Sequence, residues 1–511
     1  MPSHHFCEPG FGSRSCGGSV LAAILLLCPC AAAEDSPPNI VLFIADDVSW
    51  NDFGCYGNPA ARTPNMDRLA AGGIRFTEAY LTASSCSPSR SSIITGRYPH
   101  NIGKAAELHR EIAWHLPWFP AMLRAAGYYT ALSGKHHMKS AAPPVGEPSQ
   151  PQAFDHVDKG RTWGNSGGHA NWVQVTRDRP PDQPFFFWFA SNDAHRNWDG
   201  DRQWKAKRYG PMHRPEDVIV PPFLSDDPET RQDLASYYNE VTRFDNHVGQ
   251  VVTELAEQGQ LDNTLIFVMA DNGRPFPRAK TRLHDSGMKT ALVAHWPNGI
   301  KLRGVTSSSL VSAIDLAPTI LRVAGMEPAE TMQGVSMHPL FDNAKAVIRR
   351  VAFSEHNWHD FEAHGRSVRG DGFLFVRNFR PQFAWQGPAD SIRSPSHQRL
   401  RALRDSKQLT APQRDVFLAP RPETEFYRTV SDPHQLQNLA NSPSHTQEQL
   451  QLGKLLGQWM DETGDSVPEH ISRDSFHRET GASLKLGGDS YRGTTPGEDR
   501  DAARINASGP R

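Results

Sequence analysis

The segment Asn39-Ile40-Val41-Leu42-Phe43-Ile44-Ala45, followed by Asp46-Asp47, decides the predicted fold. It is a continuous apolar run, rich in β-branched and aromatic residues, of the kind that fills the middle of a parallel sheet. The same pattern recurs at 264–270 and is followed by Asp271 and Asn272. Two strands of one sheet would thus end in four oxygen ligands, which suit Ca²⁺ or Mg²⁺ rather than zinc. On these residues alone, Asp47 fits equally well as the cap of a turn.

Further apolar segments alternate between strand and helix patterns, which is typical of an α/β fold. Strands are predicted at 74–76, 128–132 and 184–190, and helices at 63–72, 119–126 and 233–258. Beyond residue 350 the apolar runs become short, as at 372–376, and arginines are frequent. We therefore expect one large domain at 34–349 and a smaller C-terminal subdomain at 350–464. The polar residues 465–511 are expected to form a mobile tail.

The composition argues against two classes of partner and indicates export. A net charge of −2 over 511 residues favours neither nucleic acid nor an anionic membrane. The apolar run 20–27, followed by Ala31-Ala32-Ala33, predicts a signal peptide at 1–33, and no other run is long enough to span a membrane. Four of the six cysteines lie in that segment, which leaves Cys55 and Cys86. These two could form one disulfide; if Cys86 is modified, Cys55 is left as a buried free thiol.

The most specific motif runs from Ser85 to Arg97, with the sequence SCSPSRSSIITGR. One interpretation is structural: Cys86 is a half-buried thiol, and Ser89 caps a short helix that begins near Arg90. The other is chemical: Cys86 is a reactive centre at a helix N-terminus, where the helix dipole and the arginines favour an anion. The two halves together, C-S-P-S-R and T-G-R, resemble the signature of the type I sulfatases, in which the cysteine is oxidised to formylglycine.

Three other sets of residues allow a functional and a structural interpretation. Lys135 and His137 follow the strand at 128–132 two residues apart, so an extended segment would point both to one side, although a solvated polar turn has the same composition. His195 follows the strand at 184–190, where a lone histidine is more often a satisfied surface or core residue. The arginines between Arg366 and Arg428 fit a hydrated face or the approach path of a polyanionic sugar.

The resemblance extends from about Asn39 to Leu439 and implies an alkaline-phosphatase-like fold. That fold has a large, mostly parallel central sheet flanked by helices, here the catalytic domain at 34–349, and a smaller C-terminal α+β subdomain with an antiparallel sheet. It implies one Ca²⁺ held by Asp46, Asp47, Cys86, Asp271 and Asn272. The catalytic residues that it implies are Cys86, Arg90, Lys135, His137, His195 and Lys280, and the substrate-binding residues are Lys135, His195, Lys280 and Arg366.

The resemblance also implies a mechanism for sulfate hydrolysis. Cys86, converted to 3-oxoalanine (formylglycine), would be hydrated to a gem-diol, and one of its hydroxyls would attack sulfur. Ca²⁺, with Lys135, Lys280 and Arg90, would share the negative charge of the sulfate. His195 would protonate the departing oxygen or nitrogen, and His137 would be the base that allows sulfate to leave.

The implied function is a sulfatase that hydrolyses sulfate esters or N-sulfates of a glycosaminoglycan-like carbohydrate. Residues 193–196 and 271–281 are most similar to the heparan N-sulfatase branch, also called N-sulfoglucosamine sulfohydrolases. The enzyme would be secreted or periplasmic, or lysosomal in a eukaryote. Its substrate would be a sulfated carbohydrate, and a formylglycine-generating enzyme would be its maturation partner. A homodimer is possible. Two alternatives are a phosphonate or phosphate monoester hydrolase of the same superfamily, and a non-catalytic protein that binds sulfated glycans through an unmodified Cys86.

Overall fold

The computed structural model describes residues 10, 12, 36–160 and 167–511, and residues 37–511 form one compact unit. The predicted signal peptide at 1–33 lies outside the described residues, apart from residues 10 and 12. The same holds for the four cysteines at positions 7, 16, 28 and 30. No helix within the described residues has both the length and the apolar character needed to cross a membrane.

An eight-stranded sheet organises the described chain, with the strand order β5-β4-β6-β1-β7-β8-β2-β9. Its central strand β1 pairs in parallel with β6 on one side and with β7 on the other. Strand β8 is antiparallel to both of its neighbours, so the sheet is mostly parallel, as predicted. The strands are β1 (Asn39–Ala45), β2 (Ile74–Phe76), β4 (Tyr129–Gly134), β5 (His156–Asp158), β6 (Phe185–Ala190), β7 (Thr264–Ala270), β8 (Leu292–His295) and β9 (Val305–Ser307). A separate parallel pair joins β3 (Ala79–Tyr80) and β10 (Val311–Ser312).

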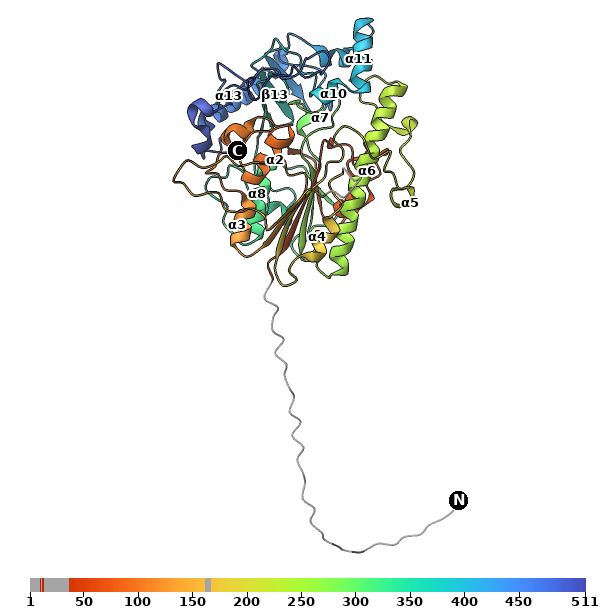
Figure 1. Cartoon of the computed structure of the whole chain (residues 1–511), viewed down its shortest axis with the longest axis vertical. Helices are drawn as coiled ribbons and strands as arrows, with labels where there is room; N and C mark the ends of the chain where they lie inside the picture. The colour runs from red at the N-terminus through yellow and green to blue at the C-terminus, as the bar shows by residue number, and fades with distance from the viewer. Residues whose placement is uncertain (1–9, 11, 13–35, 161–166) are drawn as a thin grey trace, which may run out of the picture. The chain divides into compact units, whose positions relative to one another are not determined.

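Helices cover both faces of this sheet (Figure 1). Alternate residues of β1 point to opposite faces, because the side chains of a strand alternate. Ile40, Leu42 and Ile44 pack in the apolar cluster that includes residues of α2, α3 and α8, whereas Val41 and Phe43 pack with residues of α1, α4 and α6. This burial on both faces explains why the strand sequence is apolar throughout.

The helices have the following bounds. They are α1 (Pro64–Ala71), α2 (Cys86–Thr95), α3 (Phe119–Ala125), α4 (Trp172–Asp178), α5 (Ala206–Tyr209), α6 (Pro228–Glu257), α7 (Asp285–Met288), α8 (Leu316–Val323), α9 (Pro339–Asp342), α10 (Ala389–Ile392), α11 (Pro395–Asp405), α12 (Ala411–Arg414) and α13 (Thr446–Thr463). The longest, α6, begins earlier than its apolar periodicity predicts. Its first turn is fixed by Pro228 and by the side chain of Asp227, which accepts a hydrogen bond from the Thr230 N–H at 2.9 Å.

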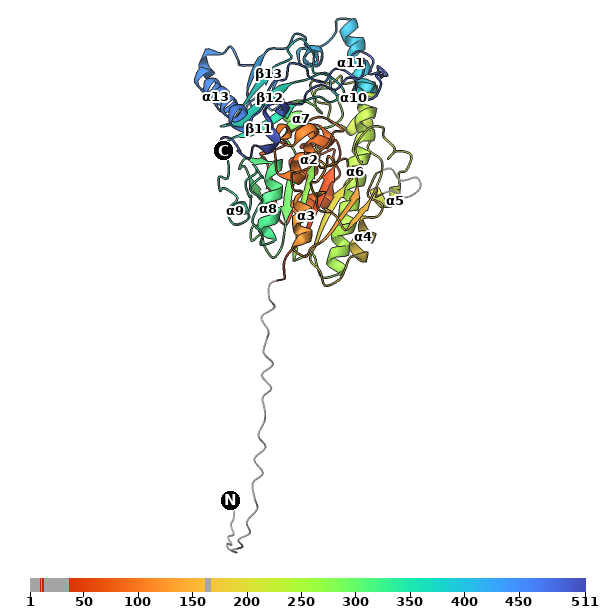
Figure 2. The same ribbon diagram turned by 60° about the vertical axis from the view of Figure 1, so that its left-hand side comes forward.

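A second, four-stranded antiparallel sheet lies in the C-terminal region, in the order β11-β12-β13-β14. Its strands are β11 (Ala352–His356), β12 (Gly365–Gly370), β13 (Phe373–Asn378) and β14 (Thr424–Arg428), and α13 packs beside them (Figure 2). The predicted antiparallel sheet is therefore confirmed. Strand β11 begins just beyond residue 350, where we place the subdomain boundary; the boundary itself stays a prediction.

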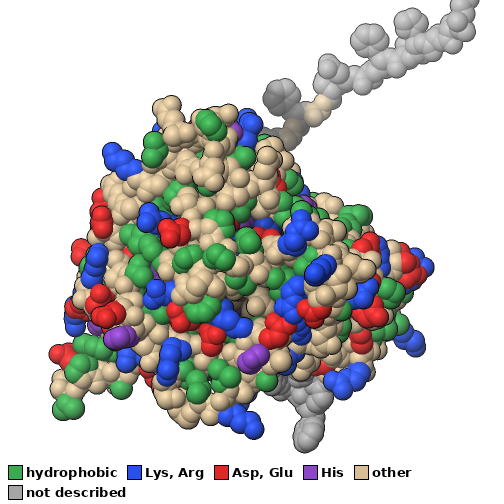
Figure 3. Space-filling model, turned by 90° about the horizontal axis from the view of Figure 1, so that it is seen from above, with side chains coloured by type: hydrophobic (Ala, Val, Ile, Leu, Met, Phe, Trp, Pro, Cys, Tyr) green, Lys and Arg blue, Asp and Glu red, His purple; other side chains and the backbone are tan. Residues whose placement is uncertain are grey.

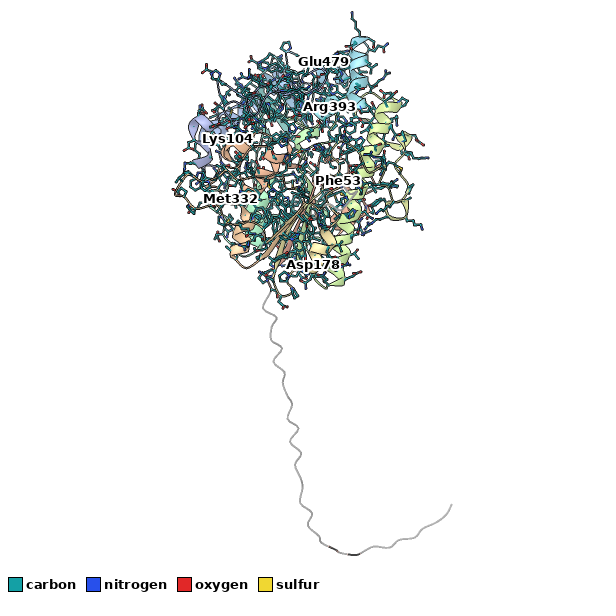
Figure 4. The ribbon with its side chains drawn as sticks, viewed as in Figure 1. Phe53, Lys104, Asp178, Met332, Arg393 and Glu479 are labelled. Atoms are coloured by element: carbon teal, nitrogen blue, oxygen red, sulfur yellow. The ribbon has the colours of Figure 1, made fainter. Side chains whose placement is uncertain are left out.

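Residues 465–511, which we expected to form a mobile tail, pack against the rest of the chain. Asp465, Thr495 and Ala502 are buried. Near α11, Arg404 donates to Glu479 at 3.0 Å; Glu479 and Arg393 are labelled in this part of Figure 4. The polar composition of the segment led to the wrong prediction, because several of its polar groups bind the body of the protein, as Asp465 does with Arg366.

The last residues of this segment are held by Arg97, the final residue of the Ser85–Arg97 motif. The buried Arg97 guanidinium donates to the carbonyl oxygens of Ala503 at 3.2 Å and Ile505 at 2.7 Å, and to Oδ1 of Asn506 at 2.9 Å. Arg97 therefore anchors the C-terminal segment.

Candidate functional site

Four neighbouring strands deliver the predicted polar residues to one edge of the large sheet. In the β1–β7 pair Ala45 lies opposite Ala270, so Asp46 and Asp271 follow side by side, and the Asp271 N–H donates to Ala45 O at 3.1 Å. Strands β6 and β4 end at the same level, with Gly134 opposite Ala190. Because parallel strands end at a common edge, residues far apart in the sequence meet there.

Cys86 lies at the first position of α2, over this edge. Ser85 is the residue before the helix. The helix therefore begins earlier than in the structural interpretation, which placed Ser89 as the cap and the first turn near Arg90. Cys86 is buried, and its Sγ lies 3.7 Å from Oδ1 of Asp46 and 3.7 Å from Oδ1 of Asp47. Cys86 and Cys55, which is half-buried, are both free, so the described chain does not form the disulfide that was left open.

Three carboxylates and three cations surround Cys86. Lys280 Nζ lies 2.7 Å from Oδ1 of Asp47, and Lys135 Nζ pairs with Asp46. The Nε of Arg90 donates to Asp271 at 2.8 Å, and its Nη2 lies 3.6 Å from Asp46. Eight of the predicted residues are thus brought together: Asp46, Asp47, Cys86, Arg90, Lys135, Asp271, Asn272 and Lys280.

Burial and the cations set the charges in this cluster. Burial alone would raise the pKa of Asp46, but Lys135, His195 and Arg90 outweigh it and hold that pKa well below its ordinary value. Burial raises the pKa of Asp271 to about 6 against the opposing effect of Arg90. Burial also raises the pKa of the Cys86 thiol above its ordinary value. Since the thiolate is the nucleophilic form, an unmodified Cys86 is not a poised nucleophile here.

His137 lies next to the cluster and contacts a second histidine. Its Nε2 is 2.7 Å from Nδ1 of His109, and both residues have a positive φ, 55° for His137 and 67° for His109. Burial and the neighbouring Lys135 lower the pKa of His137, so the imidazole is neutral at ordinary pH. Its other nitrogen, Nδ1, is shielded from solvent and has no partner among the residues described.

His195 lies at the rim of the site, with about a third of its side chain exposed. Its Nδ1–H donates to the carbonyl oxygen of Arg196, which leaves Nε2 as the free ring nitrogen. Nε2 lies 3.9 Å from Oδ2 of Asp390. A cavity of about 330 Å³ opens beside His195, Asp46 and Lys135, and it can admit a small substrate.

Arg366 is not part of this arrangement. It is fully buried in β12, where it pairs with Asp465 through two hydrogen bonds of 2.5 and 2.8 Å and donates to Asn357 at 2.9 Å. Among its contacts in the described chain, none is with another predicted site residue. Arg369 and Arg421, from the same arginine-rich region, are buried as well. On the face shown in Figure 3, Lys and Arg side chains lie interspersed with Asp and Glu.

Three residues near the site were not predicted from the sequence. His109 contacts His137, Asp390 faces His195, and Nδ1 of His359 lies 2.6 Å from the Ser85 hydroxyl beside Cys86. Each comes from a loop or a short element with no motif around it. These residues reach the site only because the folded chain places their loops at this edge of the sheet.

Comparisons with known proteins agree with this geometry. The profile of the sulfatase family matches residues 38–166 and 169–326, and that of the N-sulphoglucosamine sulphohydrolase C-terminal domain matches 278–382. The chain is 31% identical to an ulvan-active sulfatase of Formosa agariphila, over 84% of this chain and 76% of that protein. It is 30% identical to human N-sulphoglucosamine sulphohydrolase, over 88% of this chain and 95% of that protein.

Solved structures share the fold. One is a protein in complex with its substrate D-glucosamine-2-N,6-O-disulfate, with a TM-score of 0.61 and 21% identity over 83% of this chain and 98% of that one. Another is a 2-O glycosaminoglycan sulfatase, with a TM-score of 0.60 and 16% identity over 83% and 92% of the two chains. Together with the two family profiles, these matches show that the chain belongs to the sulfatase family of hydrolases.

Proposed function

We propose that this sulfatase hydrolyses sulfate esters or N-sulfates of a glycosaminoglycan-like carbohydrate, with Cys86 converted to formylglycine and one Ca²⁺ in the site. The observation that carries the proposal is the meeting of Cys86 with three carboxylates and three cations at the sheet edge. The names of the relatives support the substrate class, since one is ulvan-active and another is an N-sulphoglucosamine sulphohydrolase.

The residues present fit a calcium ion. Asp46, Asp47 and Asp271 supply carboxylate oxygens, and residue 86 lies against two of them. The Oδ1 of Asn272 is buried and lacks a hydrogen-bond partner in the described chain, as expected of an oxygen that serves as a metal ligand. Three cations already balance the three carboxylates, so a bound dication would give the site a net positive charge that suits an anion.

Five side chains around residue 86 have separate roles in this proposal. When present, Ca²⁺ supplies a Lewis acid and the formylglycine supplies the hydroxyl nucleophile. Lys135 and Lys280 bind the peripheral oxygens of the sulfate, and Arg90 fixes Asp271 in place. With both ring nitrogens protonated, His195 would keep its Nδ1–H on the Arg196 carbonyl and donate the Nε2 proton to the departing oxygen or nitrogen. The buried, unprotonated Nδ1 of His137 would accept a proton in the second half of the reaction.

Maturation and location follow from the same proposal. A formylglycine-generating enzyme of the host oxidises Cys86, and residues 1–33 direct export. The mature protein then acts outside the cell or in the periplasm, or in the lysosome of a eukaryote.

The substrate class is tested with the purified protein on three substrates: an aryl sulfate, an aryl phosphate and N-sulfoglucosamine. We expect kcat/KM for the two sulfated compounds to exceed that for the phosphate. A clear preference for the phosphate would favour the phosphate hydrolase alternative and overturn the proposal.

Removing calcium is expected to lower the stability of the fold as well as the activity. A ligand that binds only the folded state stabilises it by about 2.7 kcal/mol at a hundred times its Kd. We expect Ca²⁺, added after treatment with a chelator, to raise the urea midpoint of the metal-free protein. Asn272→Ala, which removes the unpartnered ligand oxygen, should reduce this gain. A midpoint that is the same at every Ca²⁺ concentration would contradict the proposed site.

A further inference from the structure

The carboxylate of Asp390 lies at the site but has no role in the proposed mechanism. It also lies outside the residues that the family profiles match. It lies in the short helix α10 of the C-terminal region, beyond residue 382, where the C-terminal match ends. Its Oδ1 accepts a hydrogen bond from the Ser391 N–H at 2.7 Å. Its Oδ2 is shielded from solvent, has no hydrogen-bond partner among the described residues, and lies 3.9 Å from Nε2 of His195.

The backbone around Asp390 is held rigidly. The Oδ2 of Asp360 accepts a hydrogen bond from the Ala389 N–H at 2.9 Å, and the carbonyl oxygen of Asp360 accepts one from the Ser475 N–H at 2.9 Å. The segment before α10 and the C-terminal segment therefore fix the position of the carboxylate. A preorganised group of this kind loses little entropy when it binds a ligand.

The surroundings of Asp390 keep it charged. Burial opposes ionisation, but Lys280, His195 and Arg196 outweigh it and hold the pKa of Asp390 below its ordinary value. Asp47 is also close: one oxygen of each carboxylate and a ring nitrogen of His195 lie within 4.8 Å of one another. A carboxylate oxygen without a donor is costly in such a place, and it repels an anionic substrate unless the substrate brings a donor to it.

The position of Asp390 indicates which part of the substrate it meets. His195 Nε2 is the atom that faces the leaving oxygen or nitrogen in the proposed mechanism, and Asp390 lies directly beside it. About a fifth of the Asp390 side chain is exposed, although Oδ2 itself is shielded. A ligand that enters beside His195 therefore meets the edge of this side chain, and a turn of the carboxylate toward the ligand opens Oδ2 to it. A sugar carries hydroxyl or amino groups on the carbons adjacent to the one that bears its sulfated atom, whereas a simple aryl sulfate carries no donor there.

We infer that Asp390 is a specificity-determining residue, whose carboxylate accepts a hydrogen bond from an O–H or N–H group that the leaving sugar carries next to its sulfated atom. The inference rests on the proposed function and names the part of the substrate that the site recognises. A hydrogen bond to a charged group contributes enough free energy to change kcat/KM by about 10- to 100-fold.

The test compares a sugar substrate with an aryl substrate in the same variants. We expect Asp390→Asn and Asp390→Ala to lower the ratio of kcat/KM for N-sulfoglucosamine to that for 4-nitrophenyl sulfate by about 10- to 100-fold. Asp405→Asn is the matched control, because Asp405 is an exposed residue of α11 that forms an ion pair with Arg404. It removes the same charge from the same region and should leave both rates unchanged.

Other outcomes would overturn the inference. An unchanged ratio in both variants means that Asp390 does not contact the sugar. An equal loss on both substrates, with weaker Ca²⁺ binding in calorimetry, means that Asp390 supports the metal site instead.

Calorimetric titration of the desulfated sugar, glucosamine, separates the inference from the proposed function. If the wild type hydrolyses neither substrate but binds glucosamine more tightly than Asp390→Asn does, the proposed function fails and the inference holds.

Discussion

Replacing Cys86 with alanine is expected to lower kcat for sulfate hydrolysis by at least about 10⁴-fold, because the variant cannot acquire the aldehyde that supplies the nucleophile. The fold should survive the change. Cys86 begins α2, alanine is the best helix former, and the thiol makes only long contacts of 3.7 Å with Asp46 and Asp47. The measurement is turnover of an aryl sulfate, with circular dichroism to confirm the fold.

Cys55 offers the matched control for this experiment. It is the other cysteine within the described residues, it is half-buried and free, and its backbone N–H bonds to Asp67 away from the site. Cys55→Ala should therefore keep most of the activity. A folded Cys86→Ala protein with more than a tenth of the wild-type kcat would show that residue 86 is not the source of the nucleophile.

Replacing Arg366 with alanine is expected to destabilise the fold by about 3–5 kcal/mol, because it leaves the buried carboxylate of Asp465 without its partner. The two side chains are fully buried, and their two parallel hydrogen bonds tie β12 to the C-terminal segment. The free energy of unfolding, measured by urea denaturation, tests this. The KM of the protein that remains folded should change little, since Arg366 makes no contact with the site residues.

The control is Arg322→Ala, which breaks an exposed ion pair with Glu327. Surface pairs of this kind contribute about 0–1 kcal/mol, so its unfolding midpoint should stay near that of the wild type. If Arg366→Ala unfolds like the wild type but shows a raised KM, then Arg366 contacts the substrate, as the family resemblance implied, and its buried position here is not the functional one.

The strands and the centre of the site could be predicted because the signals are local. The apolar runs at 39–45 and 264–270 correspond to β1 and β7, and the polar residues that follow them meet because parallel strands end together. The motif around Cys86 placed the thiol correctly at a helix start. Its helix begins at Cys86 rather than near Arg90, since Ser85 takes the position before the first turn.

The rest depends on contacts between residues that lie far apart in the sequence. Arg366 looked like an exposed cation, because nothing near it reveals that Asp465 lies beside it. His109 and Asp390 have no motif, and each reaches the site only through the path of its loop. The C-terminal segment looked like a tail, because its composition is polar, yet Arg97 and other groups of the body bind its backbone.

The proposed chemistry requires that residue 86 carry an aldehyde among the carboxylates and cations of the sheet edge. The most direct measurement is a mass spectrum of the peptide that contains residue 86, from protein made in a host with the formylglycine-generating enzyme. We expect formylglycine at this position, while the peptide that contains Cys55 keeps its thiol. An unmodified thiol at residue 86 in all of the protein would contradict the account.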